Sequence, residues 1–127
     1  MESNIIFFDP VISKDLIPFF KHTHYLYLSL RDSPIFSKTV PAKLQTYLAT
    51  GKPIISSISG EAKDLLTSNK CGLNVDAGDF KSLNVIFQKL NKVSSLDYVK
   101  FSENSKNLYK HQFLSKNRKK QLINYLL

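Results

Sequence analysis

The sequence predicts an α/β domain with a parallel sheet of about four strands, flanking helices and a helical tail at the C-terminus. Short apolar runs of strand length begin near residues 5, 25, 54 and 73. Each gap between two runs holds one amphipathic segment with helical spacing, and this βαβ alternation favours a parallel sheet with right-handed crossovers. The chain has 127 residues, of which 43% are hydrophobic and 22% charged, and these values fit one globular domain.

The first two strands are predicted from runs of apolar and aromatic residues. Ile5–Phe8 is a continuous apolar run that ends at an Asp-Pro pair, which is typical of a buried strand followed by a turn. A helix should follow over residues 13–20. Tyr25–Leu30 predicts the second strand, and a polar loop over residues 31–38 comes after it.

The clearest helix covers residues 40–50, followed by the third strand over residues 54–58. Thr39 is a candidate N-cap, and Pro41 suits the first turn because a proline there loses no helical hydrogen bond. Gly51 favours the end of the helix, since glycine adopts a positive φ without strain. The apolar side chains of the helix recur with its period: Val40, Leu44, Tyr47 and Leu48.

The second half of the sheet region is shorter. Ser59 is a candidate N-cap for a helix that reaches about Ser68, and residues 73–75 predict a short fourth strand. The turn over residues 76–79 offers another N-cap for a helix over residues 83–90.

A basic helical tail is expected beyond the sheet region of residues 1–94. Helical stretches are predicted over residues 95–101 and 104–126. The net charge of the chain is +8, and residues 100–127 carry 7 basic and 1 acidic side chains. Such a tail can attract nucleic acid or an anionic membrane surface, although a solvated helix face gives the same pattern. We favour the solvated helix face over a nucleic-acid partner and leave peripheral membrane contact open.

The single cysteine and the lack of long apolar runs indicate the compartment. Cys71 alone cannot form an internal disulfide framework, and we expect it to be a small buried apolar residue. No apolar run approaches the ~20 residues of a membrane span, and the first residues lack the basic start of a signal peptide. We therefore expect a cytoplasmic protein, with the inner face of the membrane as an alternative location.

The carboxyl ends of the strands are the expected ligand edge of such a sheet. Residues 37–43 offer backbone donors, a hydroxyl and two lysines at a helix start, which suits a diphosphate; an ordinary capped surface helix explains the same residues. His22 and His24 lack a third ligand, so we expect no metal site. The carboxylates near this edge form no evident acid–base pair, so no catalytic residue is assigned: Asp32, Glu61 and Asp64.

Several segments together resemble retaining GT-B glycosyltransferases of family four. The run from Pro41 to Ile55, PAKLQTYLATGKPII, is similar to their most characteristic stretch, a proline, a small residue and a lysine opening a helix that ends in glycine-lysine-proline. Asn4–Val11 resembles the strand and loop that open the nucleotide-binding half. Gly60–Leu66, Cys71–Val75 and Asn104–Phe113 resemble the segments that follow. The resemblance covers nearly the whole chain and is strongest to enzymes that build bacterial surface polysaccharides.

The resemblance implies a Rossmann-like nucleotide-sugar-binding region over residues 1–94 and C-terminal helices over residues 95–127. It implies a nucleotide diphosphate sugar as donor, hexosyl transfer with retention, and no essential metal or cofactor. The family's donor site is framed by two glutamates eight residues apart; their positions hold Lys38, beside Ser37, and Thr46. Val11 matches a loop whose backbone meets the base. The diphosphate-cradling backbone is matched by Thr39, Val40, Pro41 and Lys43.

Both glutamates, the family's acceptor-binding domain and the first strands of its donor domain have no counterpart in the sequence. We therefore expect the chain to bind a nucleotide sugar without transferring sugar unaided, as a truncated product or one subunit of a split enzyme. Its expected partner is a separate acceptor-domain chain or a second copy. Two alternatives stay open: a non-catalytic docking module with the same half-fold, and a nucleic-acid or membrane binder that uses residues 100–127.

Overall fold

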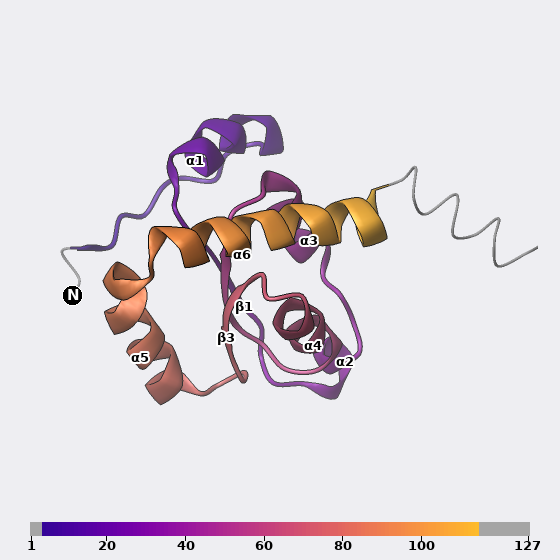
Figure 1. Cartoon of the computed structure of the whole chain (residues 1–127). Coiled ribbons are helices and arrows are strands. Elements are labelled where there is room, and N and C mark those ends of the chain that lie inside the picture. Colours follow the sequence, from indigo (N-terminus) through magenta and orange to yellow (C-terminus); the bar gives the residue numbers. More distant parts are fainter. Residues whose placement is uncertain (1–3, 115–127) are drawn as a thin grey trace, which may run out of the picture.

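A computed structural model describes residues 4–114, which form a three-stranded parallel sheet with helices on both faces (Figure 1). The sheet order follows the sequence: β1 (Leu26–Ser29), β2 (Ile54–Ser57) and β3 (Gly72–Val75). The chain is therefore an α/β protein as predicted, and the arrangement fits part of a Rossmann-like fold.

The predicted first strand is wrong, so the sheet has three strands rather than four. Residues 5–8 are extended but do not belong to the sheet, and their side chains are exposed, Phe7 by 91%. An apolar run indicates that burial of its side chains is favourable, but it does not specify the strand with which the run would pair. Among the described residues β1 pairs only with β2 and is an edge strand. Association with a second copy of the chain stays a prediction, which light scattering of the purified chain tests.

The helices mostly follow the predicted order. The 13–20 segment forms a 3-10 turn and a short helix, and the loop after β1 contains an unpredicted helix, α2, that is only four residues long. In chain order the elements are η2 (Ser13–Leu16), α1 (Ile17–His22), α2 (Pro34–Ser37), α3 (Ala42–Thr50), α4 (Glu61–Ser68), α5 (Phe80–Lys89), η3 (Leu90–Lys92), α6 (Ser95–Leu108) and η4 (Tyr109–Phe113).

Helix α3 forms largely as its sequence predicts. Its side chains Leu44 and Leu48 are fully buried, each stabilising the fold by about 1.5–3 kcal/mol. Gly51 ends the helix with φ 72°, the left-handed conformation that glycine allows. The N-cap is Pro41 rather than Thr39. Thr39 instead donates a hydrogen bond to the Phe36 carbonyl at 3.3 Å, so its hydroxyl belongs to the preceding turn.

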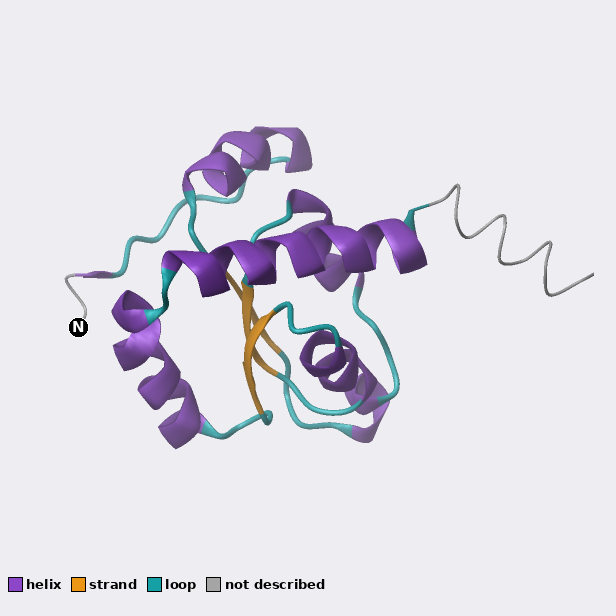
Figure 2. Cartoon of the chain, in the orientation of Figure 1, coloured by secondary structure: helices purple, strands orange, loops and turns teal. Residues whose placement is uncertain are grey.

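The two faces of the sheet carry separate cores (Figure 2). Side chains of α3, α4 and α6 pack with Leu28 and Ile54 on one face. Helix α5 packs with Ile55 and Val75 on the other. The split follows from the alternation of side chains along each strand, because Leu26 lies opposite Ile54 and Tyr27 opposite Ile55.

Helix α6 lies across the amino ends of the three strands. Its side chains donate hydrogen bonds to carbonyl groups that shortly precede each strand: Tyr98 to His24 at 2.7 Å, Ser102 to Gly51 at 2.5 Å, Asn104 to Lys70 at 3.0 Å and Ser105 to Cys71 at 3.4 Å. The helix is continuous from residue 95 to residue 108. The predicted break after residue 101 is therefore wrong. These bonds close the amino end of the sheet and leave the loops at its carboxyl end uncovered by α6.

The C-terminal tail is described only as far as residue 114. The predicted helix over residues 104–126 therefore extends outside the described residues, and four of the seven basic side chains of residues 100–127 lie outside them as well. Within residues 4–114, no helix combines the length and apolar character needed to cross a membrane.

Candidate functional site

The loop after β1 brings the predicted segment of residues 37–43 to the carboxyl end of the sheet. Ser33 caps α2 by accepting a hydrogen bond from the Ile35 amide at 3.3 Å. Ser37 then donates from its hydroxyl to the Pro34 carbonyl at 2.9 Å. These local bonds fold the loop into a compact turn, which sets the start of α3 at the edge where parallel α/β sheets bind ligands.

Helices α3 and α4 both begin at this edge without a side-chain cap. The residue before α3 is Pro41 and the residue before α4 is Gly60, and neither supplies a capping acceptor. Ser59, the predicted cap of α4, instead accepts a hydrogen bond from the Ala77 amide at 3.0 Å. By contrast, α2, α5 and α6 are capped by Ser33, Asp79 and Ser94. The first amides of α3 and α4 are therefore available to an anion.

The loops that lead to the two uncapped helix starts touch where the backbone of Ser37, the last residue of α2, meets Gly60. A Cβ atom added at Gly60 would collide with the carbonyl group and Cα of Ser37. Gly60 also has φ 82° and ψ −150°, a conformation that is almost restricted to glycine. The loops after β1 and β2 can meet only because this position has no side chain. Sequence reasoning placed Gly60 within the resemblance but gave no sign of this contact.

The start of α3 is open to solvent and carries positive charge. Lys38, Thr39, Ala42 and Lys43 are all exposed, so no other described element covers the helix start. The Lys43 Nζ lies 5.6 Å from the centre of the Tyr47 ring, within the range of a cation–π contact. Of five hollows on the described part of the chain, none is lined by residues 37–43. The segment is thus an exposed basic surface rather than a cleft.

Two predicted site residues lie apart from this surface. Val11 lines a hollow of about 340 Å³ in the N-terminal segment, together with Phe8 and Phe19; in Figure 1 this segment and α1 lie at the opposite end from α2. Thr46 lines a hollow of about 490 Å³ between α3 and α1, and its hydroxyl donates to the Ala42 carbonyl at 3.3 Å. The structure brings Ser37, Lys38, Thr39, Val40, Pro41 and Lys43 into one segment but does not add Val11 to it.

The carboxylates at this edge form no acid–base pair. Asp32, Glu61 and Asp64 are exposed. Asp76 forms an ion pair with Lys63, whose Nζ lies 2.6 Å from the Asp76 carboxylate. Asp79 caps α5, and the hydrogen bonds from Ser82 lower the pKa of its carboxyl group. Its role is therefore structural.

Cysteine and histidine add no reactive centre to the described residues. Cys71 is fully buried, as predicted, and burial raises the pKa of its thiol to about 11, so the thiol is neutral at pH 7. His22 and His24 are exposed. Residues 4–114 contain no group of three or more His, Cys, Asp or Glu side chains placed to hold a metal ion.

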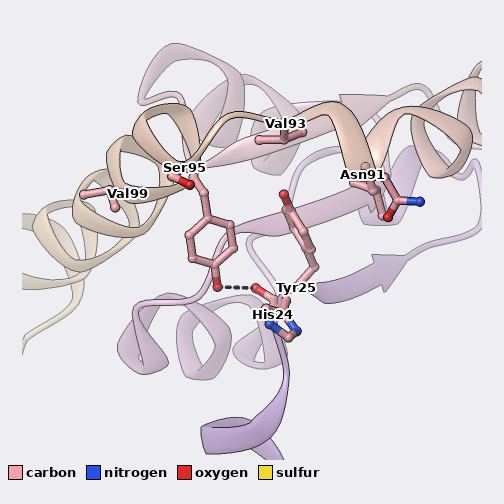
Figure 3. A pocket seen from close by; sticks show the side chains of 8 residues that line it. His24, Tyr25, Asn91, Val93, Ser95 and Val99 are labelled. Atoms are coloured by element: carbon pink, nitrogen blue, oxygen red, sulfur yellow. Dashed lines mark hydrogen bonds between the residues drawn. The ribbon is translucent and has the colours of Figure 1, made fainter.

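A second hollow, which sequence reasoning missed, lies at the amino end of the sheet. Its volume is about 580 Å³, and Tyr25 and Tyr98 meet in it edge to face, with ring centres 5.4 Å apart. Figure 3 shows Asn91 and Ser95 to either side of the two tyrosine rings. The hollow is formed by the residues before β1, by η3 and by the first turns of α6.

Comparison with models of known protein families, with curated proteins and with solved structures finds no match to this chain.

Proposed function

We propose that the chain is the donor-binding part of a retaining glycosyltransferase and binds a nucleotide diphosphate sugar at the carboxyl end of its sheet. The observation that supports this most directly is the pair of uncapped helix starts, α3 and α4, whose preceding loops touch through Ser37 and Gly60. Amides at two helix starts favour a group with several anionic oxygens. The resemblance of residues 41–55 to the family's most characteristic stretch supports the same ligand.

The exposed lysines give the proposed diphosphate its counter-charge. Lys38 precedes α3 by a few residues and Lys43 lies in its first turn. Both are exposed, so each contributes modestly and the expected affinity is weak. We place the segment of Thr39, Val40 and Pro41 beside the diphosphate, with the amides of Ala42 and Lys43 as its donors, because Pro41 has no N–H and the Thr39 amide bonds to the Phe36 carbonyl. Thr46 lies further along α3, and a contact with Val11 would require movement of the N-terminal segment.

Sugar transfer requires an acceptor held against the donor, and we propose that this chain does not supply the acceptor site. The described residues 4–114 hold a single three-stranded sheet. In two-domain transferases the reaction takes place between the domains, where closure positions the reactants. Transfer would therefore require an acceptor-binding domain, whether of the same protein or of another.

Isothermal titration with UDP, GDP and their sugars tests the donor site. We expect heat from at least one of these ligands at millimolar concentration. The double variant Lys38→Ala/Lys43→Ala should weaken binding roughly tenfold, because it removes two partners of the diphosphate. The variant Lys89→Ala/Lys100→Ala removes the same charge from exposed sites on α5 and α6 and is the matched control.

Two results would count against the proposal. One is the absence of heat at millimolar ligand from a sample shown to be folded by circular dichroism. The other is an equal loss of affinity in both double variants, because it would mean that the ligand responds only to the net charge of the protein and not to the start of α3.

A further inference from the structure

The hollow between Tyr25 and Tyr98 has the size and composition of a small-molecule site. Its volume of about 580 Å³ lies within the roughly 300–1,000 Å³ typical of ligand sites. Most of its lining is aliphatic or aromatic, and a few side chains add polar groups. The lining residues are His24, Tyr25, Leu90, Asn91, Val93, Ser95, Tyr98 and Val99.

The lining contains no lysine, arginine, aspartate or glutamate, although the chain as a whole carries a net charge of +8. A charged ligand would find no carboxylate, ammonium or guanidinium group among these side chains, and a charge removed from water without a partner is unfavourable. The complementary ligand is therefore uncharged, which separates this hollow from the basic surface around Lys38 and Lys43.

Polar groups without protein partners line the same hollow. Among residues 4–114, the hydroxyls of Tyr25 and Ser95 and the amide of Asn91 have no hydrogen-bond partner. A purely apolar ligand would remove these groups from water without replacing their hydrogen bonds. A ligand with an apolar ring face and hydroxyl groups around its rim satisfies both kinds of lining, and a pyranose sugar has this form.

The tyrosine pair is held in place before any ligand arrives. The Tyr98 hydroxyl donates to the His24 carbonyl at 2.7 Å, as Figure 3 shows, and the Tyr98 ring packs edge to face on Tyr25. Burial raises the pKa of both phenols, so both hydroxyls keep their protons at neutral pH. A rigid aromatic pair loses little conformational entropy when a ligand binds.

We propose that the hollow formed by Tyr25, Asn91, Ser95 and Tyr98 binds an uncharged sugar ring. The site lies at the amino end of the sheet, away from the proposed nucleotide-sugar surface. The proposal depends only on the lining of this hollow and does not require the chain to bind a nucleotide.

Nuclear magnetic resonance of the full-length ¹⁵N-labelled chain tests this site with defined probes. The sugars are the methyl glycosides of glucose, galactose, mannose and N-acetylglucosamine, and the comparison ligands are benzyl alcohol and UDP. At least one sugar should shift amide signals at residues 24–25 and 90–99, and benzyl alcohol should bind more weakly. UDP should leave these signals unchanged, whatever it does at residues 37–43, so the two sites are tested separately.

Variants in the lining distinguish the proposed contacts from a general effect of solvent. Tyr25→Phe keeps the ring and removes the hydroxyl, and Asn91→Ala removes an exposed amide. Each should weaken sugar binding about three- to tenfold, as expected for one hydrogen bond. Asn84→Ala, an exposed asparagine of α5 outside the lining, should leave the affinity unchanged.

The same spectra report whether each variant is folded. The proposal is overturned if none of the four sugars shifts residues 24–25 and 90–99 at 100 mM, a concentration far above ~1 mM dissociation constants. It is also overturned if benzyl alcohol binds more tightly than every sugar, or if Asn84→Ala weakens binding as much as Asn91→Ala.

Discussion

The amino and carboxyl ends of the sheet differ in the charge that the folded chain favours. At the amino end, burial raises the pKa values of Tyr25, Cys71 and Tyr98, so the folded state holds these groups neutral. At the carboxyl end, hydrogen bonds from Ser82 lower the pKa of Asp79 and hold it charged.

The difference follows from where α6 lies. Side chains of α6 bond to carbonyl groups before all three strands, so α6 covers the amino end and pairs these backbone carbonyls. The carboxyl end has no such cover, and the starts of α3 and α4 lack side-chain caps. A ligand at the carboxyl end should therefore be anionic, and one in the hollow at the amino end should be uncharged.

The largest expected effect is at the carboxyl end, from Gly60→Ala. The new Cβ would collide with Ser37, and the backbone conformation of Gly60, with φ 82°, disfavours any side chain. We expect the free energy of unfolding to fall by about 3 kcal/mol, as measured by urea denaturation at pH 7. Binding of UDP should weaken as well, because the loops that lead to the two helix starts would move apart.

Gly78→Ala is the matched control for this substitution. Gly78 has φ 81°, nearly the same as Gly60, but a Cβ added there meets no atom within 4 Å. Only the strain of a side chain at a positive φ remains, and we expect the free energy of unfolding to fall by about 1 kcal/mol. Equal losses in the two variants would show that the contact between the two loops at Ser37 and Gly60 contributes nothing to stability.

Local patterns made part of the fold predictable. Helix α3 and strand β2 were predicted because their signals are contiguous: an apolar period, then Gly51 and Pro53, then an aliphatic run. Residues 5–8 have an equally clear apolar run, but a strand also needs a partner edge, and that is a non-local property. Helix α2 was missed because four residues are too short for a period to show.

The candidate site was likewise predictable only in part. The βαβ order alone places residues 37–43 at the carboxyl end, and the structure agrees on that location, although their role stays a prediction. The contact of Ser37 with Gly60 depends on backbone angles that no residue pattern encodes. The hollow at the amino end joins His24 and Tyr98, which are 74 residues apart, so no local motif could have indicated it.

The second expected effect concerns the amino end and appears at alkaline pH. The thiol of Cys71 has a reference pKa of 9.0 in the unfolded chain and about 11 in the folded chain. Below pH 9 both states keep the proton, so its contribution to stability is constant. Between pH 9 and 11 the unfolded state loses the proton more readily, and the free energy of unfolding should fall by about 2 kcal/mol.

Cys71→Ala isolates this effect, because the variant lacks the titrating group. Both proteins would be unfolded with urea at pH 8 and pH 10.5 in the presence of a phosphine reductant. The variant is less stable throughout, since it leaves a small cavity, but it should lose less stability between the two pH values than the wild type. The tyrosines and lysines titrate in both proteins and cancel in the comparison. Parallel pH profiles would mean that the amino end does not favour the neutral thiol.

The smallest expected effect tests the opposite preference at the carboxyl end. Asp79 accepts a hydrogen bond from the Ser82 amide at 3.1 Å, and Asp79→Asn keeps an acceptor while removing the charge. Because folding lowers the pKa of Asp79, the stability that its charge contributes is present above the reference pKa of 3.8 and is lost as the pH falls below it.

Wild type and Asp79→Asn should therefore differ in unfolding free energy at pH 7 and converge in acid, when urea unfolding is compared at pH 7 and pH 3. Asp79→Ala, which also removes the acceptor, should be less stable than Asp79→Asn at both pH values. If the difference between wild type and Asp79→Asn did not depend on pH, the charge of Asp79 would contribute nothing. The only charged side chains invoked at the carboxyl end would then be the exposed lysines. Solvent and salt largely screen the contribution of such side chains to stability.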